Sequence, residues 1–279
     1  MVSVRKGKND KMCKFSLITV CLNPGKKLRI SLESALCQTF HDFELIIKDG
    51  GSNDGSLESV SDLTADPRIR IFSQSDTGIY DAMNQAVAHA NGEYVFFLNC
   101  GDRLYNEQVL EKTAEAMRKS GVAGSHGVFY GKVYNKRTAA WIIPPPKITG
   151  FTCYRNVPCH QACFYALNLC KEKPFETRYK IRGDYEHFLW CWYRAGAAMQ
   201  YMDLPVAEYE GGGFSETREN LKRSDDEHKQ ITAVYMSLGE LFLYRLILVV
   251  TLAPLRRRLS ESKRFAAVYN MLIGKLYRR

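Results

Sequence analysis

The chain has 279 residues, of which 46% are hydrophobic and 25% charged, proportions that fit a globular protein and exclude a disordered one. A chain of this length can bury one large core together with a small appendage. Its formal charge of +9 is concentrated at the ends, in a basic N-terminal arm over residues 1–14 and in a C-terminal tail that contains Arg256, Arg257 and Arg258. The charge therefore describes the termini, and no nucleic-acid partner is expected.

The nine cysteines are scattered through apparent core segments and include no CxxC pair. Four of them gather between residues 153 and 170, but their spacings fit no standard zinc pattern. We therefore expect buried free thiols in a reducing cytosol. No apolar stretch follows the basic N-terminus, so no signal peptide is expected and the predicted location is cytoplasmic.

Strands and helices alternate through the first half of the chain. Short runs rich in apolar residues predict strands at residues 15–22, 43–47, 69–72 and 94–98, of which the first and the last are expected to be buried. Helices are predicted for residues 28–36, for the stretch between the second and third strands, and for residues 79–90 and 107–119. This alternation predicts an α/β fold with a mostly parallel sheet, wound in one direction and flanked by helices.

The pattern becomes mixed beyond Gly121. Predicted elements are a strand pair at 128–134 and 139–143, a strand at 160–167, a helix at 184–194, and two short strands at 199–202 and 206–209. We predict one domain over residues 15–210, with halves at 15–120 and 121–210. Residues 211–279 form a predicted helical and basic extension.

Acidic residues follow three of the predicted strands: Asp49, Asp76 and Asp102. The carboxyl ends of parallel strands meet at one edge of the sheet, which is where open α/β sheets bind ligands. A carboxylate there suits a hard divalent cation shared with substrate phosphates. Each acid could equally cap a helix or close a turn.

Five motifs in order carry a family resemblance: TVCLN (19–23), IIKDGGSNDGS (46–56), SDTGIYDAMNQAVAHANGEYVFFLNCGD (75–102), HQACFY (160–165) and RGDYEHFLW (182–190). With them the chain resembles the family 2 inverting glycosyltransferases, which are nucleotide-sugar-dependent enzymes of the GT-A fold. The resemblance covers residues 15 to 209. The GIYDAMN run is most similar to bacterial enzymes that assemble surface polysaccharides such as exopolysaccharide, capsule or O-antigen.

The resemblance implies roles for individual residues. Asp184 matches the family's catalytic base, and Asp102 matches the last acid of its DxD motif, which holds Mg²⁺ or Mn²⁺ on the donor diphosphate. The first acid of that motif is replaced by Cys100, or by Asn99 in the neighbouring register. The implied donor-binding residues are Thr19, Leu22, Asn23, Asp49, Asp76, Tyr80, Asn84, Cys100, Gly101 and His160.

Some of these assignments have a structural alternative. His160 could donate to or ligate near the diphosphate, or it could be a hydrogen-bonded core residue. Tyr80 and Asn84, which lie at i and i+4 on one helix face, could reach the donor or hold their helix against the sheet. Asp184 could cap its helix instead of serving as the base.

One positioned carboxylate and one metal suffice for an inverting transfer, because no protein nucleophile is required. Glu186 is two residues from Asp184 on a helix, where side chains diverge, so it is not expected to form a hydrolytic pair with it. The incomplete DxD motif leaves a second hypothesis, a catalytically inactive nucleotide-sugar-binding or scaffold protein. Retention of both Asp102 and Asp184 argues against it.

The segment from Leu241 to Ala253 is almost wholly apolar. As a helix it would span about 20 Å, which is short of the ~30 Å hydrocarbon core of a bilayer. Basic residues and an amphipathic stretch at 265–277 follow it, a combination that predicts peripheral binding to the inner face of the cell membrane, where lipid-linked acceptors are met. The alternatives are a helical hairpin packed on the core and a homodimer contact.

Overall fold

The computed structural model of the chain describes residues 14–122, 126–211 and 217–251. The predicted basic arm up to residue 13, the arginines at 256–258 and the amphipathic stretch at 265–277 lie outside the described residues. The chain divides into two compact units, Met1–Lys229 and Gln230–Arg279. The first unit contains the whole sheet and the pocket discussed below.

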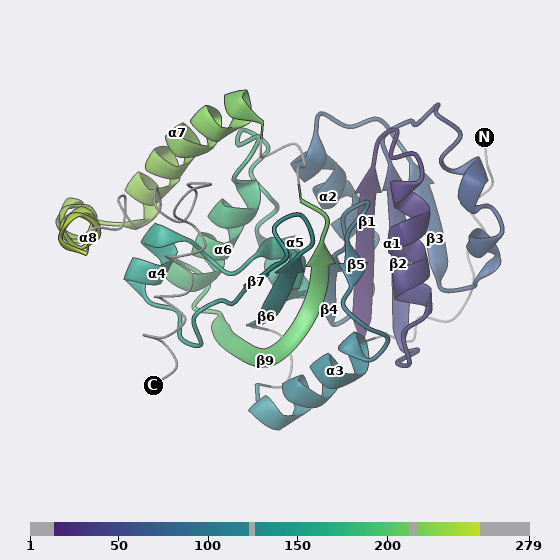
Figure 1. Ribbon diagram of the computed structural model, residues 1–279, viewed down its shortest axis with the longest axis horizontal. Helices are drawn as coiled ribbons and strands as arrows, with labels where there is room; N and C mark the ends of the chain where they lie inside the picture. The colour runs from purple at the N-terminus through teal and green to yellow at the C-terminus, as the bar shows by residue number, and fades with distance from the viewer. Residues whose placement is uncertain (1–13, 123–125, 212–216, 252–279) are drawn as a thin grey trace. The chain divides into compact units, whose positions relative to one another are not determined.

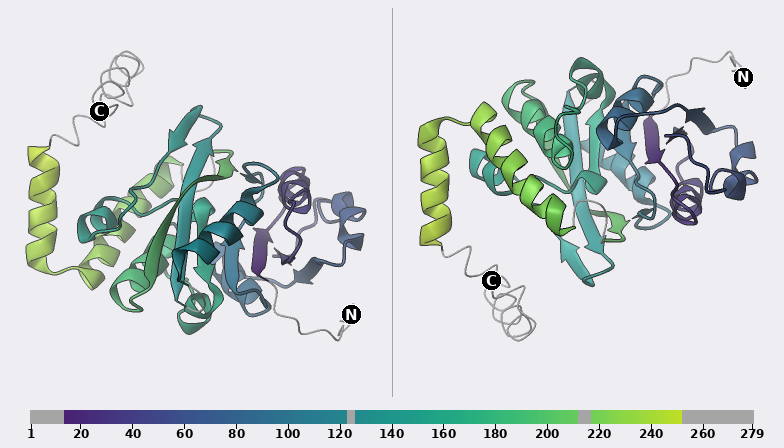
Figure 2. Two further views of the ribbon diagram at one scale, coloured as in Figure 1. Left: turned by 90° about the horizontal axis from the view of Figure 1, so that it is seen from below. Right: turned by 90° about the horizontal axis from the view of Figure 1, so that it is seen from above.

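The first half contains a parallel sheet with helices on both faces, as predicted. Its elements are β1 (Phe15–Cys21), α1 (Lys27–Leu36), β2 (Phe43–Asp49), β3 (Ile69–Ser73), α2 (Ile79–Val87), β4 (Tyr94–Phe97) and α3 (Val109–Ser120). In Figure 1, α1 lies in front of the strands and α2 lies behind them, and the views of Figure 2 also show the sheet between helices. β1, β2 and β4 are consequently mostly buried on both faces, whereas β3, at the edge of the sheet, is partly exposed.

The connection between β2 and β3 differs from the prediction. Instead of a helix it forms two short 3₁₀ turns, Glu58–Val60 and Leu63–Ala65. The apolar residues Leu57, Val60 and Leu63 recur every third position, which matches the 3₁₀ period of 3.0 residues per turn and not the α-helical period.

The prediction that the parallel sheet is wound in one direction was also wrong. The order of the strands is β3-β2-β1-β4, so the chain builds outward from β1 to β3 and then returns to place β4 on the other side of β1. Such a reversal is a topological switch point, where adjacent loops run to opposite faces of the sheet and leave a crevice between them. The sheet therefore places a crevice at the carboxyl ends of β1 and β4.

The second half extends the sheet in mixed directions, as predicted. Its elements are β5 (Arg103–Leu104), β6 (Gly127–Asn135), β7 (Ala140–Ile142), α4 (Gly150–Arg155), a 3₁₀ turn (His160–Ala162), β8 (Cys163–Ala166), α5 (Leu167–Glu172), α6 (Gly183–Tyr193) and β9 (Ala198–Tyr209). Within the described residues the sheet has nine strands, in the order β3-β2-β1-β4-β8-β6-β9-β5, with β7 paired to β6. β8 is antiparallel to both β4 and β6, whereas β9 is parallel to β6.

Two elements of this half differ in extent from the prediction. The strand expected from His160 begins at Cys163, because His160–Ala162 form the 3₁₀ turn. The two short strands expected after residue 199 are one long strand, β9, whose register with β6 shifts beside Lys132. The irregularity accommodates Pro205, which has no N–H to donate to the ladder.

Two helices end the described chain, α7 (Arg218–Tyr235) and α8 (Leu238–Val250). α8 begins three residues before the apolar run because Ser237 and Glu240 form a capping box at its N-terminus. Over the residues described here, no helix combines the length and the apolarity needed to cross a bilayer.

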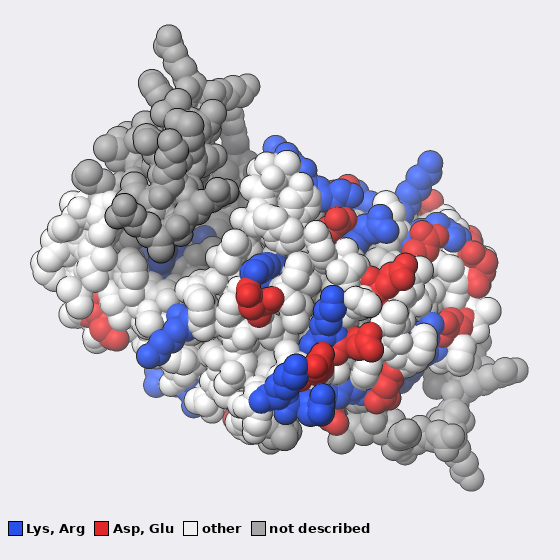
Figure 3. Space-filling view, turned by 60° about the horizontal axis from the view of Figure 1, so that its bottom comes forward, with Lys and Arg blue, Asp and Glu red and all other residues white. Residues whose placement is uncertain are grey.

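Two further features are the distribution of charged side chains on the surface and the burial of the cysteines. On the face shown in Figure 3, Lys and Arg lie interspersed with Asp and Glu over the described surface. The eight cysteines in the described part of the chain are free thiols, and most are buried, as expected; Cys37 is exposed.

Candidate active site

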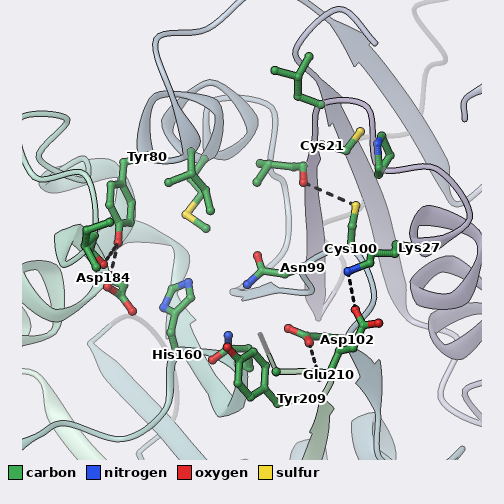
Figure 4. A pocket seen from close by; sticks show the side chains of 18 of the residues that line it. Cys21, Lys27, Tyr80, Asn99, Cys100, Asp102, His160, Asp184, Tyr209 and Glu210 are labelled. Carbon is green, nitrogen blue, oxygen red and sulfur yellow. Dashed lines mark hydrogen bonds and ion pairs between the residues drawn. The ribbon is translucent and has the colours of Figure 1, made fainter. Parts of the chain in front are cut away.

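A pocket of about 350 Å³ occupies the crevice at the carboxyl ends of β1 and β4. Its walls come from the β1–α1 connection, the start of α2, the turn after β4, the 3₁₀ turn before β8, the start of α6 and the end of β9. Figure 4 shows Asp184 and Tyr80 on one side of it, Asp102, Glu210 and Lys27 on the other, and Asn99 and His160 between. Predicted site residues that line it are Leu22, Tyr80, Cys100, Asp102, His160 and Asp184.

The turn that carries Asp102 is fixed by α1. The Ser31 hydroxyl lies 2.9 Å from the Asn99 carbonyl and 2.8 Å from the Asp102 carbonyl, and it accepts a hydrogen bond from the Gly101 N–H at 2.9 Å. Gly101 has a φ of +96°, a conformation in which a side chain would be strained. The Gly101–Asp102 pair therefore turns the chain sharply as soon as it leaves the sheet.

The Asp102 carboxylate is buried at the pocket wall, with 3% of the residue exposed. One oxygen, Oδ1, accepts a hydrogen bond from the Glu210 N–H at 3.0 Å. The other, Oδ2, is buried without a hydrogen-bond partner in the described part of the chain. Burial raises the Asp102 pKa to about 7; the Glu210 N–H opposes this rise, and the nearby Glu210 charge adds to it. A buried carboxylate oxygen without a partner is costly, so it calls for a ligand.

Sequence reasoning missed two charged residues beside Asp102. Glu210 follows β9, and its carboxylate forms an ion pair with Lys27 at 2.9 Å. Asp49, Asp76 and Asp102 were selected because each lies just past the carboxyl end of a predicted strand. Glu210 has the same position after β9, but the sequence did not indicate that β9 ends at this edge of the sheet. Lys27, at the start of α1, carried no comparable signal.

These residues fit a divalent cation that is held jointly with a substrate. Asp102 supplies a carboxylate oxygen that has no partner among the described residues, and Glu210 supplies a second carboxylate beside it. The described residues contain no group of three or more potential ligands from His, Cys, Asp and Glu. Such a site suits Mg²⁺ or Mn²⁺ completed by phosphate oxygens, since Mg²⁺ usually takes one or two carboxylates plus substrate phosphates.

Asp184 lies in the first turn of α6, on the opposite side of the pocket. α6 begins at Gly183 after Arg182, so Asp184 is the second residue of the helix, and the alternative of a helix cap does not match the structure. The Tyr80 hydroxyl lies 3.0 Å from Asp184 Oδ1 and 2.8 Å from the Ile181 carbonyl, and it can donate its proton to either. The helix N-terminus favours a negative charge at this position.

Gly183 allows the Asp184 turn to sit against Tyr80. A Cβ at position 183 would lie 2.7–2.9 Å from three carbons of the Tyr80 ring, closer than side chains approach one another. Tyr80 is itself 6% exposed, and burial raises its pKa well above the usual value, so its hydroxyl stays a donor. Glycine at 183 and tyrosine at 80 together fix where the Asp184 carboxylate lies.

His160 lies in the core and also at the pocket. The imidazole is stacked on Phe97, with ring centroids 5.0 Å apart, and is 7% exposed, as a core residue would be. It also lines the pocket, and its Nε2 is buried without a partner among the described residues. Burial lowers the His160 pKa, so the neutral imidazole is favoured. Its role toward the donor stays a prediction.

Several predicted residues lie outside the pocket lining. Thr19 is fully buried and donates its hydroxyl to the Leu98 carbonyl at 2.9 Å, which ties β1 to the end of β4. The Asn84 amide makes two hydrogen bonds to the backbone of Phe175, at 2.9 and 2.8 Å, and so holds α2 to the segment before α6. Asn84 thus anchors its helix, although to the segment at Phe175 and not to the sheet, and donor binding by Asn84 remains a prediction.

The loop after β2 is ordered by its own polar residues. Asp49 accepts hydrogen bonds from the Gly51 and Ser52 N–H groups, while Asn23 Oδ1 accepts one from the Asn53 N–H at 2.9 Å. Burial opposes ionisation of Asp49, but hydrogen bonds from the Ser52 side chain, from the Ser52 and Gly51 N–H groups and from the Ser73 side chain outweigh it and lower the Asp49 pKa. Asp76 forms an ion pair with the buried Lys48. Donor binding by Asn23, Asp49 and Asp76 remains a prediction.

Similar sequences carry related names. A protein of Mycobacterium bovis named PGL/p-HBAD biosynthesis glycosyltransferase is 33% identical over 216 residues, which cover 75% of this chain and 83% of that protein. A cholesterol galactosyltransferase of Borreliella burgdorferi is 29% identical over 148 residues, covering 52% of this chain and 41% of the relative.

Solved structures share the fold. S. aureus TarS 1–349 in complex with UDP matches with a TM-score of 0.65 and 20% identity, over 90% of this chain and 73% of that one. Mannosyltransferase PcManGT from Pyrobaculum calidifontis, in complex with GDP-Man and Mn²⁺, matches with a TM-score of 0.57 and 12% identity, over 94% and 84%.

A family model described as glycosyl transferase family 2 matches residues 16–172, more than half of the chain. These residues run from β1 to α5 and include the Asp102 turn and His160. The chain therefore belongs to glycosyltransferase family 2.

Proposed function

We propose that the protein transfers a sugar from a nucleotide-sugar donor to an acceptor hydroxyl, with inversion at the anomeric carbon. The observation that supports this most is the presence of two carboxylates in one pocket. Asp102 has a buried oxygen with no partner in the part of the chain that the structure describes, and Asp184 is held by Tyr80 on the opposite side. The donor diphosphate would lie toward Asp102 and the acceptor hydroxyl toward Asp184.

In this arrangement Asp184 acts as the general base. Its carboxylate takes the proton from the acceptor hydroxyl while that oxygen attacks the anomeric carbon and the bond to the nucleoside diphosphate breaks. The Tyr80 hydroxyl orients the carboxylate by donating to one of its oxygens, which leaves the other for the acceptor. Asp102 and Glu210 would hold Mg²⁺ or Mn²⁺, which when bound neutralises charge on the leaving diphosphate.

The test is release of nucleoside diphosphate by the purified protein from a panel of UDP-, GDP- and dTDP-sugars with Mn²⁺. We expect one donor to be consumed, with release lost in excess chelator and in Asp184→Asn. A donor that raises the unfolding temperature without being consumed, with or without a panel of acceptors, would instead support the inactive nucleotide-sugar binder.

We further propose that the acceptor is a glycan or a lipid-linked sugar of a bacterial cell-surface polysaccharide or glycolipid. The names of the relatives support this class, since one is a PGL/p-HBAD biosynthesis enzyme and another a cholesterol galactosyltransferase. A lipid-linked acceptor would be met at the cytoplasmic face of the membrane.

α8 supports a peripheral membrane location. Its exposed apolar residues lie along one broad side of the helix: Leu238 (87% exposed), Phe242 (71%), Leu243 (50%), Leu246 (47%), Val249 (64%) and Val250 (71%). An apolar helix face of this kind, too short to span a bilayer, suits the membrane interface.

The location is tested by flotation with anionic and neutral liposomes. The parent protein should float with anionic liposomes, and a protein ending at Ser237 should not, while both should bind the donor equally. A truncated protein that still floats would contradict the role of α8. Concentration-dependent dimerisation of the parent, without flotation, would assign the same face to a homodimer.

A further inference from the structure

A buried glutamate on α7 binds the backbone just ahead of Asp184. Glu227 is 6% exposed, and its carboxylate accepts hydrogen bonds from three consecutive N–H groups: Lys180 at 2.8 Å, Ile181 at 3.0 Å and Arg182 at 2.9 Å. Lys180 bonds to Oε1, and the other two bond to Oε2. Hydrogen bonds to an ionised acceptor are roughly twice as strong as neutral ones, so this carboxylate compensates its burial through three of them.

A second contact joins the same two segments. The Arg182 Nε–H group donates to both the carbonyl and the hydroxyl of Ser224, at 2.9 and 2.8 Å. Ser224 lies one helical turn before Glu227, on the same side of α7. α7 therefore contacts both the backbone and the side chain of the segment that leads into α6.

The segment 180–182 is held from its other side by α2. The carbonyl of Ile181 lies 2.8 Å from the Tyr80 hydroxyl, the same hydroxyl that lies 3.0 Å from Asp184 Oδ1. Lys180 and Ile181 also line the pocket. A shift of this backbone would therefore move the pocket wall, Tyr80 and Asp184 together.

We propose that Glu227 is a positioning residue for the reaction: it fixes segment 180–182 so that the Asp184 carboxylate faces the acceptor. α7 up to this residue is then part of the catalytic apparatus, although the sequence placed it in the extension. This inference rests on the proposed function, because positioning is useful only if Asp184 acts as the base. A misplacement of about 1 Å at a reacting group can lower a rate about 10²-fold.

Glu227→Gln tests the proposal with little change in volume. A glutamine has one acceptor oxygen, and its NH₂ group would face at least one backbone N–H, placing two donors against each other. We expect kcat to fall roughly 10- to 100-fold, while the donor KM changes little because Asp102 lies across the pocket. The matched control is Asp226→Asn, which removes one charge from an exposed position of the same helix and should leave kcat unchanged.

A double-mutant cycle separates positioning from general stability. If Glu227 acts through Asp184, Glu227→Gln should lower the rate much less in an Asp184→Asn background than in the parent. An equal loss in both backgrounds, or a kcat equal to that of the Asp226→Asn control, would overturn the proposal. Should Glu227→Gln fail to fold, Glu227→Asp, which keeps the charge but shortens the reach, is measured in the same cycle.

Amide hydrogen exchange gives a readout that does not depend on turnover. Exchange at residues 180–182 should be slow in the parent and faster in Glu227→Gln, with the sheet unchanged. Fast exchange there in the parent would show that the contact does not hold the segment and would overturn the inference. A protected segment in a protein that consumes no donor would instead refute the proposed function and leave the contact itself intact.

Discussion

Replacing Asp184 by asparagine separates catalysis from structure at this site. Asparagine has nearly the same shape as aspartate. Its Oδ1 can still accept a hydrogen bond from the Tyr80 hydroxyl, which lies 3.0 Å from Asp184 Oδ1 in the parent protein. Gly183, packed against the Tyr80 ring, is unchanged. The substitution therefore removes the ability to take a proton and leaves the local geometry in place.

The expected loss of catalytic free energy is several times larger than the expected loss of folding stability. Loss of general-base assistance lowers the rate by roughly 10²- to 10⁴-fold, which corresponds to about 2.7–5.5 kcal/mol in the activation barrier. Loss of the charge in the first turn of α6 costs only about 0.3–1 kcal/mol of folding stability. A large kinetic effect with a small stability effect is thus the signature of a base.

The assay measures three quantities on one purified sample: turnover at saturating donor, donor affinity, and the urea midpoint of unfolding. Tyr80→Phe serves as the comparison, because it keeps the ring against Gly183 but removes the donor to Asp184; it should slow turnover less than Asp184→Asn does. Near-parental turnover of a folded Asp184→Asn protein would refute the assignment of Asp184 as the base.

The other predictions concern the metal, the Asp184 turn and pH. Asp102→Asn should abolish turnover and weaken donor binding in the presence of Mn²⁺ or Mg²⁺; full activity of the parent in excess chelator would contradict a metal role. Gly183→Ala should cost about 1–3 kcal/mol of stability and slow turnover, because its Cβ would meet the Tyr80 ring at 2.7–2.9 Å; unchanged urea midpoint and kcat would contradict this. Burial, with the Lys173 charge, lowers the His187 pKa from 6.5 to about 3, so the unfolded chain binds a proton below pH 6.5 that the folded protein excludes. Stability should then fall by about 1.4 kcal/mol on going from pH 7.5 to 5.5, and a His187→Phe protein with an equally steep loss would contradict this origin.

The sequence predicted the parts of the fold that depend on local patterns. Tyr94–Leu98 is a continuous apolar run, as a strand covered on both faces requires, and all four strands of the parallel half were correctly assigned. The order of the strands was not predictable in this way. The return of β4 to the side of β1 is decided by packing of the whole sheet, and no residue near β4 records it.

Site residues could be predicted where their residue type and their place after a strand or in a family motif identify them in the sequence. Asp102 follows a buried strand, and Asp184 sits in a motif of the family, so both could be named from the sequence. Glu227 could not, because its partners are backbone N–H groups, which every residue except proline carries. Its neighbours in α7 are mostly charged, so a single buried glutamate does not stand out among them.

The close approach of Gly101 and Glu210 has a consequence for comparing relatives. Glu210 Oε2 lies where a Cβ of residue 101 would be, so the glutamate occupies the volume that the glycine leaves free. Residues 101 and 210 are far apart in the chain but compete for the same volume. A side chain at position 101, already strained by the φ of +96°, would push the flexible end of Glu210 away from its ion pair with Lys27. Among homologous sequences we therefore expect the two positions to covary: a relative with a side chain at the position of Gly101 should carry a shorter or displaced residue at the position of Glu210, and the proposed cation would then be held by a different set of oxygens.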